Sequence, residues 1–146
     1  MANHWDIDNS PGFWMHLAFN RKRQASVDAF KAAGFAITPE QWAVMVRLWQ
    51  SEGRSQTEIA NLTFRDRASV TRIIDALEVM GYCERRADPS DRRAKRVFLT
   101  EEGRRVESDL TPIVAAFVEK AYASISMEER ANLNALMQKV YSNLSE

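Results

Sequence analysis

Positive charge is concentrated directly after a turn-forming segment in the second half of the chain. Asp-Pro-Ser-Asp at residues 88–91 is typical of a turn, and it is followed by four basic residues within five positions: Arg92, Arg93, Lys95 and Arg96. Guanidinium groups are drawn to the negative potential of a DNA minor groove, which a narrow hairpin tip can approach. We therefore expect this segment to contact DNA, with a solvated turn as the alternative.

A second set of polar residues is expected on one face of a helix over residues 66–80. Val70, Ile73, Ile74 and Leu77 recur at helical spacing and predict a packed stripe. The candidate DNA contacts on the remaining surface are small, hydrogen-bonding or basic, namely Arg67, Ala68, Ser69, Thr71 and Arg72. Small residues near its start would let the helix enter a major groove, where Arg72 could reach guanine O6 and N7. Any surface helix has such a polar face, which is the alternative interpretation.

The elements that must position these residues are marked by helix caps. Capping boxes at residues 38–41, 55–58 and 126–129, and a cap at Thr100, mark four helix starts, while Ser10-Pro11 and Asp66 suggest two more. The pattern predicts helices near 11–33, 38–52, 55–62, 66–80, 101–123 and 127–144. Two short strands, 82–87 and 95–99, are expected between Gly81 and Thr100. The sequence therefore predicts a mostly α protein with a small β-hairpin wing, in which residues 38–100 form a winged helix-turn-helix.

The segment "SQTEIANLTFRDRASVTRIIDALEVMGYCERRADPSDRRAKRVFLTEEGRR" resembles the core of the MarR family of bacterial transcription regulators. The family's wing pattern, D-x-R followed by five residues and then L-T, is met by Asp91, Arg93, Leu99 and Thr100, with Gly103 in the following E-x-G context. The resemblance implies a homodimer on double-stranded DNA, in which Arg93 enters the minor groove and Asp91 orients it. It also implies a sequence-specific regulator, with repression of a palindromic operator and release by an effector as the expected mode.

Dimerisation is predicted from the two ends of the chain, residues 11–33 and 101–146. The last two helices are amphipathic, and the expected interface residues are Val106, Leu110, Ile113, Phe117, Leu133, Leu136 and Val140. A two-fold partner would bury these stripes and place two recognition helices one DNA turn apart. Packing within one chain is the alternative.

The family often binds small aromatic or lipophilic anions between its dimer helices and its winged domain. Aromatic residues crowd the first third of this chain, and most are expected in the core. The resemblance implies that Trp14, His16 and Trp42 could line such an effector site. We expect no cofactor and no metal, because His4 and His16 match no ligand spacing. Cys83 is expected to be structural.

Composition bounds the remaining classes of function. The 146 residues fit one domain, 1–146, with a net charge of zero, yet residues 54–105 hold 12 Lys and Arg against 9 Asp and Glu, or +3. A lone cysteine and an acidic, polar first ten residues favour a cytoplasmic protein, and no apolar run approaches a membrane span. No nucleophile elbow, phosphate loop or H-E-x-x-H motif points to an enzyme. A winged-helix protein-interaction module without DNA binding is the alternative function.

Overall fold

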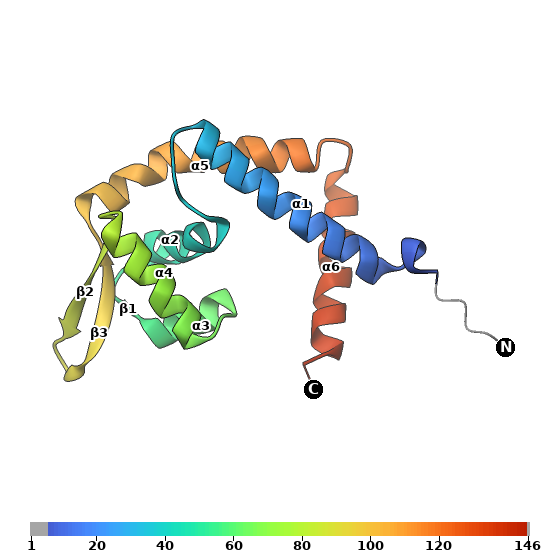
Figure 1. Ribbon diagram of the computed structural model, residues 1–146. Helices are drawn as coiled ribbons and strands as arrows, with labels where there is room; N and C mark the ends of the chain where they lie inside the picture. Colours follow the sequence, from blue (N-terminus) through green and yellow to red (C-terminus); the bar gives the residue numbers. More distant parts are fainter. Residues whose placement is uncertain (1–5, 146) are drawn as a thin grey trace.

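The computed structural model describes residues 6–145 and arranges them as a winged lobe beneath long helices (Figure 1). In chain order the elements are η1 (Ile7–Asn9), α1 (Pro11–Ala32), α2 (Pro39–Gln50), β1 (Arg54–Ser55), α3 (Gln56–Thr63), α4 (Arg67–Val79), β2 (Cys83–Asp88), β3 (Asp91–Leu99), α5 (Glu101–Ala121) and α6 (Met127–Asn143). The lobe consists of α2, α3, α4 and the three strands, while α1 packs against α5 above it. The predicted fold class is confirmed.

Every α-helix begins at a side chain that caps it. The caps are Ser10, Thr38, Ser55, Asp66, Thr100 and Ser126, and each accepts a hydrogen bond from a backbone N–H three residues later. Three of them form complete capping boxes, in which the side chain at the third helical position returns the bond. These bonds satisfy N–H groups that have no partner within the helix, so all six predicted helix starts are confirmed.

The sheet differs from the predicted two-stranded hairpin in two respects. A third strand, β1, pairs antiparallel with β3, so that the order is β1-β3-β2. Strand β1 consists only of Arg54 and Ser55, which is also the cap of α3, and it follows Gly53 in a left-handed conformation. A strand of two residues is too short for a periodic pattern to predict. Strand β3 also begins at Asp91 rather than at Lys95. Arg92 and Arg93 therefore lie on a strand, and the turn itself is reduced to Pro89 and Ser90.

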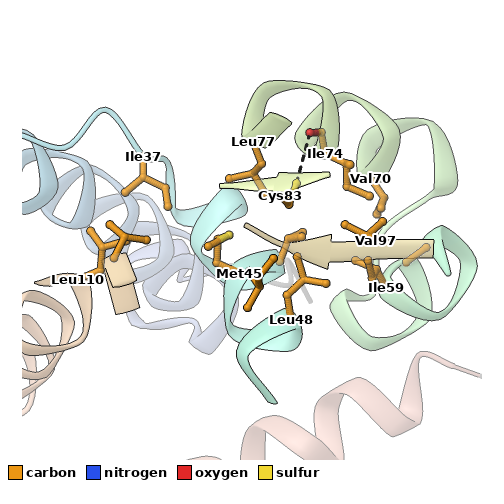
Figure 2. Close-up of a cluster of buried hydrophobic side chains, with 14 of the residues drawn as sticks. Ile37, Met45, Leu48, Ile59, Val70, Ile74, Leu77, Cys83, Val97 and Leu110 are labelled. Carbon is orange, nitrogen blue, oxygen red and sulfur yellow. Dashed lines mark hydrogen bonds between the residues drawn. The ribbon is translucent and has the colours of Figure 1, made fainter. Parts of the chain in front are cut away.

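The hydrophobic core lies between the sheet and the helices of the winged lobe (Figure 2). Val70, Ile74 and Leu77 of α4 are fully buried in it, as the helical spacing predicted. Ile73, expected in the same stripe, is only partly buried and packs at the edge of the core. The close-up also shows Leu110 of α5 beside Ile37, so the start of α5 belongs to the same core.

Helix α6 leaves the end of α5 at a steep angle and runs down beside the winged lobe, which it contacts near its own end (Figure 1). None of its residues is buried. Its one aromatic contact with the lobe joins the ring of Tyr141 to that of Phe64, with 5.8 Å between the ring centroids. Phe64 is itself exposed and takes a left-handed conformation where α3 ends. A single chain thus leaves the apolar side of α6 uncovered.

Candidate nucleic-acid interface

Helix α4 presents the polar face that its sequence predicts. Its cap, Asp66, accepts a hydrogen bond from the backbone N–H of Ser69 at 2.8 Å. Bonds from the Ser69 hydroxyl and backbone hold the pKa of the Asp66 carboxyl below its ordinary value. Ala68, Arg72 and Asp75 are exposed on the face opposite the buried stripe. The start of α4 therefore offers a small, polar surface of the kind that fits a major groove.

The hydroxyl groups on this face are already engaged. The Ser69 hydroxyl donates to the Asp66 carboxylate at 2.6 Å, and the Thr71 hydroxyl donates to the carbonyl oxygen of Arg67 at 2.9 Å. Thr71 Oγ1 also accepts a bond of 2.8 Å from Gln56 Nε2. Thr71 thus has both its donor and an acceptor position occupied within the protein, and its methyl group is the part left to meet a base.

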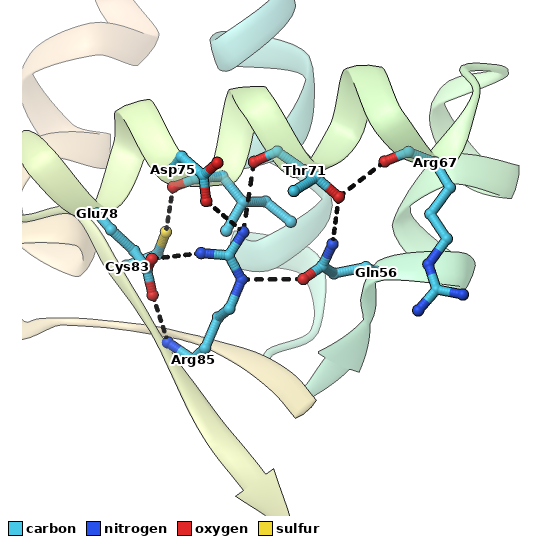
Figure 3. Close-up of polar contacts among 8 residues, drawn as sticks. Gln56, Arg67, Thr71, Asp75, Glu78, Cys83 and Arg85 are labelled. Carbon is cyan, nitrogen blue, oxygen red and sulfur yellow. Dashed lines mark hydrogen bonds and ion pairs between the residues drawn. The ribbon is translucent and has the colours of Figure 1, made fainter. Parts of the chain in front are cut away.

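Two basic side chains of α4 keep donors available for a ligand. Arg72 Nη2 makes one long contact of 3.4 Å with Ser69 Oγ, and Arg67 has no hydrogen bond or ion pair from its guanidinium within residues 6–145. Figure 3 shows the Arg67 guanidinium extending away from its neighbours. Because an arginine donates through five N–H groups in a planar fork, these two side chains are the strongest candidates on α4 for base or phosphate contacts.

The basic residues of the wing fall into two classes, those that pair with a carboxylate and those that do not. Arg96 Nε donates to the Asp88 carboxylate at 2.5 Å, and Arg96 Nη1 donates to the carbonyl oxygen of Gly53 at 2.8 Å. Arg86 pairs with Glu84 on the same strand and lies over the Phe98 ring. In contrast, three exposed cations have no ion pair within the part of the chain that the structure describes: Arg92, Arg93 and Lys95.

Asp91 acts on Arg93 differently from what the resemblance implies. Its carboxylate accepts a hydrogen bond of 2.9 Å from the backbone N–H of Arg93, and no ion pair within residues 6–145 joins it to the guanidinium. Asp91 therefore fixes the chain direction after the turn, while the Arg93 side chain stays free to extend. The side-chain pair that the resemblance implies is therefore not formed between these two residues in the free chain, and the role of Asp91 in orienting Arg93 on DNA stays a prediction.

Asp88 and Arg96 hold the wing turn, a role that was not predicted for either residue. The Asp88 carboxylate accepts bonds from the hydroxyl and backbone N–H of Ser90 at 2.7 and 2.9 Å. These bonds, together with Arg96, lower the pKa of Asp88 from 3.8 to about 2. The Asp-Pro-Ser-Asp sequence was a sufficient signal for this turn, since an Asp side chain commonly bonds the backbone two residues on.

Arg85 is a further residue that sequence reasoning missed. It extends from β2 to α4 and α3, with its side chain only 13% exposed, and contacts Gln56, Asp75 and Glu78 (Figure 3). A signal was present, because Arg85 lies two residues after the buried Cys83 and so faces the same side of the strand. Asp75 and Glu78 are three residues apart on one side of α4 and supply the complementary charge.

The three residues predicted to line an effector site do not meet within one chain. Trp42 packs into the lobe, 5.9 Å from Phe30 and 5.2 Å from Trp49 between ring centroids. Trp14 is exposed and contacts the ring of Phe13. Trp14 lies about 24 Å along α1 from Phe30, at a rise of 1.5 Å per residue. His16, near Trp14, makes a side-chain contact of 3.0 Å with Asn20.

The residues predicted for the dimer interface fall into two groups. Val106 and Leu110 are fully buried in the core of the single chain, which corrects their assignment to an interface. The physical reason is that the first turns of α5 cover the base of the winged lobe. Partly buried Ile113 packs against that core, and partly buried Phe117 lies beyond it on α5. The α6 residues of the set are exposed in one chain, namely Leu133, Leu136 and Val140.

Cys83 has the environment of a structural residue. It is buried in β2, and burial raises the pKa of its thiol to about 12. Because a thiolate is the reactive form, this thiol is poorly suited to nucleophilic chemistry. No group of three metal-binding side chains occurs among residues 6–145, and His4 lies outside the described residues. Within the same range, no helix is long and apolar enough to cross a membrane.

Comparison with known proteins places this geometry in a family. A family model described as "MarR family" matches residues 37–95, which span the winged lobe from two residues before α2 into β3. The chain is 28% identical over 108 residues to the uncharacterized HTH-type transcriptional regulator YybA of Bacillus subtilis, covering 74% of this chain and 72% of that one.

Solved structures extend the likeness to nearly the whole chain. A probable transcriptional regulator from Pseudomonas aeruginosa aligns with a TM-score of 0.84 and 28% identity, covering 92% of this chain and 98% of that one. The transcriptional repressor CouR bound to a 23-mer DNA duplex aligns with a TM-score of 0.79 and 28% identity, covering 96% of each chain. CouR from Rhodococcus jostii is also solved with p-coumaroyl-CoA, and aligns with a TM-score of 0.80, 26% identity and coverage of 93% and 94%.

Proposed function

The chain belongs to the MarR family of DNA-binding transcription regulators, and from this premise we propose that it binds a palindromic operator in a sequence-specific manner as a homodimer. The observation that carries the proposal is the distribution of cations on the winged lobe. Arg85 and Arg96 are held by carboxylates, whereas Arg67, Arg72 and Arg93 extend from the two elements that would meet DNA. The cations left unpaired among the described residues are those that a polyanion could neutralise.

Helix α4 and the wing would read different grooves. Arg72 projects from the small, polar face of α4, which suits a major groove about 12 Å wide. A bidentate contact from Arg72 to guanine would discriminate against other bases by about 1–3 kcal/mol. The wing is a two-stranded hairpin whose exposed cations include Arg93, and it suits a minor groove, where Arg side chains are favoured by the negative potential. Arg92 and Lys95 would contribute phosphate contacts beside it.

A homodimer is supported by the uncovered side of α6. Its exposed apolar residues recur at helical spacing, as Leu133, Leu136, Met137, Val140, Tyr141 and Leu144. A contiguous apolar patch on a protein of this size marks an interaction surface. A second copy carries the same patch and would cover it through a two-fold contact. Two winged lobes would then face two half-sites of a palindrome.

We propose further that the protein is a repressor that a small aromatic or lipophilic effector releases. Support comes from CouR, which is named a repressor and is solved with DNA and with p-coumaroyl-CoA. This chain has a cleft of about 210 Å³ between α1 and the winged lobe, lined by Phe19, Lys22, Arg23, Ser26, Pro39, Glu40 and Arg65. Arg65 immediately precedes Asp66, the cap of α4, so a ligand in this cleft would act on α4, the helix proposed to enter the major groove. We propose this cleft beside the site expected around Trp14, His16 and Trp42, which stays a prediction.

The proposal is tested by gel-shift measurements with genomic fragments at two salt concentrations. A regulator should retard a subset of fragments, and the retardation should weaken steeply as salt is raised, because bound phosphates release counterions. Arg72→Ala should bind the selected and unselected fragments with more nearly equal affinity. Retardation of every fragment alike would contradict sequence-specific binding. No retardation at either salt concentration would favour the alternative, a winged-helix module that binds another protein.

A further inference from the structure

Arg85 of β2 lies at the junction of the wing with α3 and α4 (Figure 3). Its Nη2 donates to the Asp75 carboxylate at 2.7 Å and to the carbonyl oxygen of Thr71 at 3.3 Å. Its Nη1 donates to the Glu78 carboxylate, which also accepts the Arg85 backbone N–H at 2.8 Å. Its Nε donates to Gln56 Oε1 at 2.9 Å. One guanidinium therefore connects β2 both with α4 and with the start of α3, which lies 29 residues away.

Gln56 continues this connection to the face of α4 that would meet DNA. While its side-chain oxygen accepts from Arg85, its Nε2 donates to Thr71 Oγ1 at 2.8 Å. Thr71 in turn donates to the carbonyl oxygen of Arg67, in the first turn of α4. We call the set of Arg85, Gln56, Thr71, Asp75 and Glu78 the Arg85 bridge. Together with the bond from Thr71 to the carbonyl oxygen of Arg67, its hydrogen bonds run from β2, at the junction of the wing, to the first turn of α4.

The contacts of the Arg85 bridge restrict movement of the wing relative to α4. The Arg85 side chain is 13% exposed, while two carboxylates from one side of α4 oppose its single positive charge. Charge-assisted bonds to a planar fork fix direction as well as distance, which the single ammonium group of a lysine does not. The neighbouring Arg86 provides a contrast, because its carboxylate partner Glu84 lies on the same strand.

A small change at Arg85 would be magnified at the wing cations. Arg85 pairs with Val97 in the β2–β3 register, and Arg93 lies four residues nearer the turn on β3. At about 3.3 Å per residue, the distance from the pivot to Arg93 is about 13 Å, so a tilt of about 10° would move Arg93 by about 2 Å. That displacement is large compared with the tolerance of a hydrogen bond.

We infer that Arg85, with Gln56, is a positioning residue for DNA recognition, which holds the wing at a fixed angle to α4 so that Arg93 and Arg72 reach their grooves together. The inference rests on the proposed DNA-binding function and adds a residue that need not touch DNA. Its consequence is that Arg85 contributes to affinity through Arg93. Removing Arg85 should therefore lower the DNA affinity when Arg93 is present, and should lower it much less when Arg93 has been replaced.

A double-mutant cycle tests this dependence. The affinities of the wild type, Arg85→Met, Arg93→Ala and the double variant are measured by fluorescence anisotropy on a fragment that the wild type selects. Arg85→Met should weaken binding at least about fivefold in the wild-type background and less than about twofold in the Arg93→Ala background, since interacting residues in one network are non-additive. Equal losses in the two backgrounds would overturn the inference, because a general loss of stability acts alike in both.

Further variants separate the Arg85 bridge from folding and from charge. Arg85→Lys keeps the positive charge but lacks the planar guanidinium. It should recover less than half of the DNA-binding free energy that Arg85→Met loses. Arg86→Met removes a neighbouring arginine and should show no coupling to Arg93. Gln56→Ala cuts the link to α3 and Thr71 while leaving Asp75 and Glu78 paired, and should couple to Arg93 in the same direction as Arg85→Met. It provides the same comparison if Arg85→Met does not fold.

The same measurements distinguish a failure of the proposed DNA binding by the wing from a failure of the positioning role of Arg85. Unchanged affinity of the single variant Arg93→Ala would remove the wing contact from the proposed function, and the positioning role would fall with it. Weaker binding by Arg93→Ala together with additive behaviour of both Arg85→Met and Gln56→Ala would leave the wing contact standing and reject the positioning role alone.

Discussion

Arginine side chains of the winged lobe differ in what their guanidinium groups contact. Arg85 and Arg96 are held by carboxylates from other parts of the lobe, and Arg86 by one on its own strand. Arg93 has no such partner among the described residues. An arginine that is already paired gains less from a phosphate than one that is solvated, because the existing pair must be given up. The unpaired side chains are therefore where substitutions should affect DNA binding without affecting folding.

Arg93→Ala should weaken DNA binding while leaving folding nearly unchanged. Surface substitutions usually change the free energy of unfolding by no more than about 0.5 kcal/mol. A charge-assisted bond to DNA would be removed from both half-sites of a dimer, so affinity should fall at least about tenfold. The slope of log K against log salt should decrease by roughly 0.9 for each phosphate that Arg93 no longer neutralises. Gel shifts at several salt concentrations and urea unfolding measure both effects.

The control for Arg93→Ala is Arg105→Ala, which removes an exposed charge from the first turns of α5, outside both α4 and the wing. It should leave the DNA affinity and the salt slope close to those of the wild type. Arg93→Lys should recover part of the affinity, because an ammonium group keeps the charge but lacks the planar fork. Wild-type affinity in Arg93→Ala would remove the wing from the binding mechanism.

At the scale of the element, the wing depends on its turn. Asp88 is buried although it is charged, and it closes the turn through Ser90 and joins it to Arg96. Hydrogen bonds from Ser90, followed by the contact with Arg96, lower the pKa of the Asp88 carboxyl to about 2. A group whose folded pKa lies below its unfolded pKa stabilises the fold above the unfolded value. That stabilisation is lost as the pH falls through the folded value.

Asp88→Asn should therefore change the pH dependence of stability in acid. Near pH 6 the wild type should have the higher free energy of unfolding, because only the carboxylate pairs with Arg96. The difference between the two proteins should begin to narrow near pH 3.8 and become small near pH 2. Urea unfolding of both proteins at several pH values measures it. A difference that stays constant from pH 6 to pH 2 would contradict the role of the Asp88 charge.

The junction between the wing and α5 depends on a close backbone contact. The backbone N–H of Thr100 donates to the carbonyl oxygen of Tyr82 at 3.1 Å, and Trp49 Nε1 donates to the carbonyl oxygen of Gly103 at 2.8 Å. A Cβ atom added to Gly103 would lie 1.8 Å from the Tyr82 carbonyl oxygen. No side chain fits there unless the backbone moves, and this explains the glycine that follows the wing motif.

Gly103→Ala should destabilise the protein by about 1–3 kcal/mol, as overpacking of a rigid contact usually does. Urea unfolding gives the free energy, and the matched control is Gly12→Ala. Gly12 lies near the start of α1 with no atom within 4 Å of an added Cβ, so that substitution should be neutral or stabilise by up to about 1 kcal/mol. Equal stability of Gly103→Ala and the wild type would show that the junction can relax.

In the molecule as a whole, α6 is the helix whose apolar residues are left exposed by a single chain. It carries exposed apolar residues along its length, and its end touches only the ring of Phe64 among the aromatic residues of the lobe that the structure describes. The start of α5, in contrast, is committed to the core through Val106 and Leu110. The proposed dimer contact therefore moves toward the last helix, compared with the interface expected from the sequence.

Leu136→Asp combined with Val140→Asp should convert the proposed dimer into monomers. Both side chains are exposed in one chain, at 51% and 41%, so the substitutions should not disturb the core. A buried, unpaired carboxylate in a dimer contact would cost several kcal/mol. Light scattering gives the mass. Val79→Asp, at an apolar residue of α4 that is 90% exposed, is the control and should remain dimeric. A dimeric double variant would place the interface elsewhere.

The six helices and the presence of the wing hairpin could be predicted from the sequence, because their signals are local, whereas the two-residue strand β1 gives no such signal. A helix cap and the residue that it satisfies are three positions apart, and the stripe of Val70, Ile74 and Leu77 repeats within one helix. The wing motif likewise lies within one short segment, so Arg93 and Asp91 could be singled out as candidates. Both the fold class and the family follow from such short-range patterns.

The pairing of charges and of apolar faces depends on tertiary packing, which the sequence patterns do not reveal. The sequence contains Arg85, Arg86 and Arg96 as equivalent basic residues, yet the packing of β2 against α4 buries the first, and the turn engages the last. The same applies to the amphipathic stripes, since Val106 meets its own core while Leu136 does not. The physical reason is that a side chain's partner depends on which elements pack together, and that is set by contacts between residues far apart in the chain.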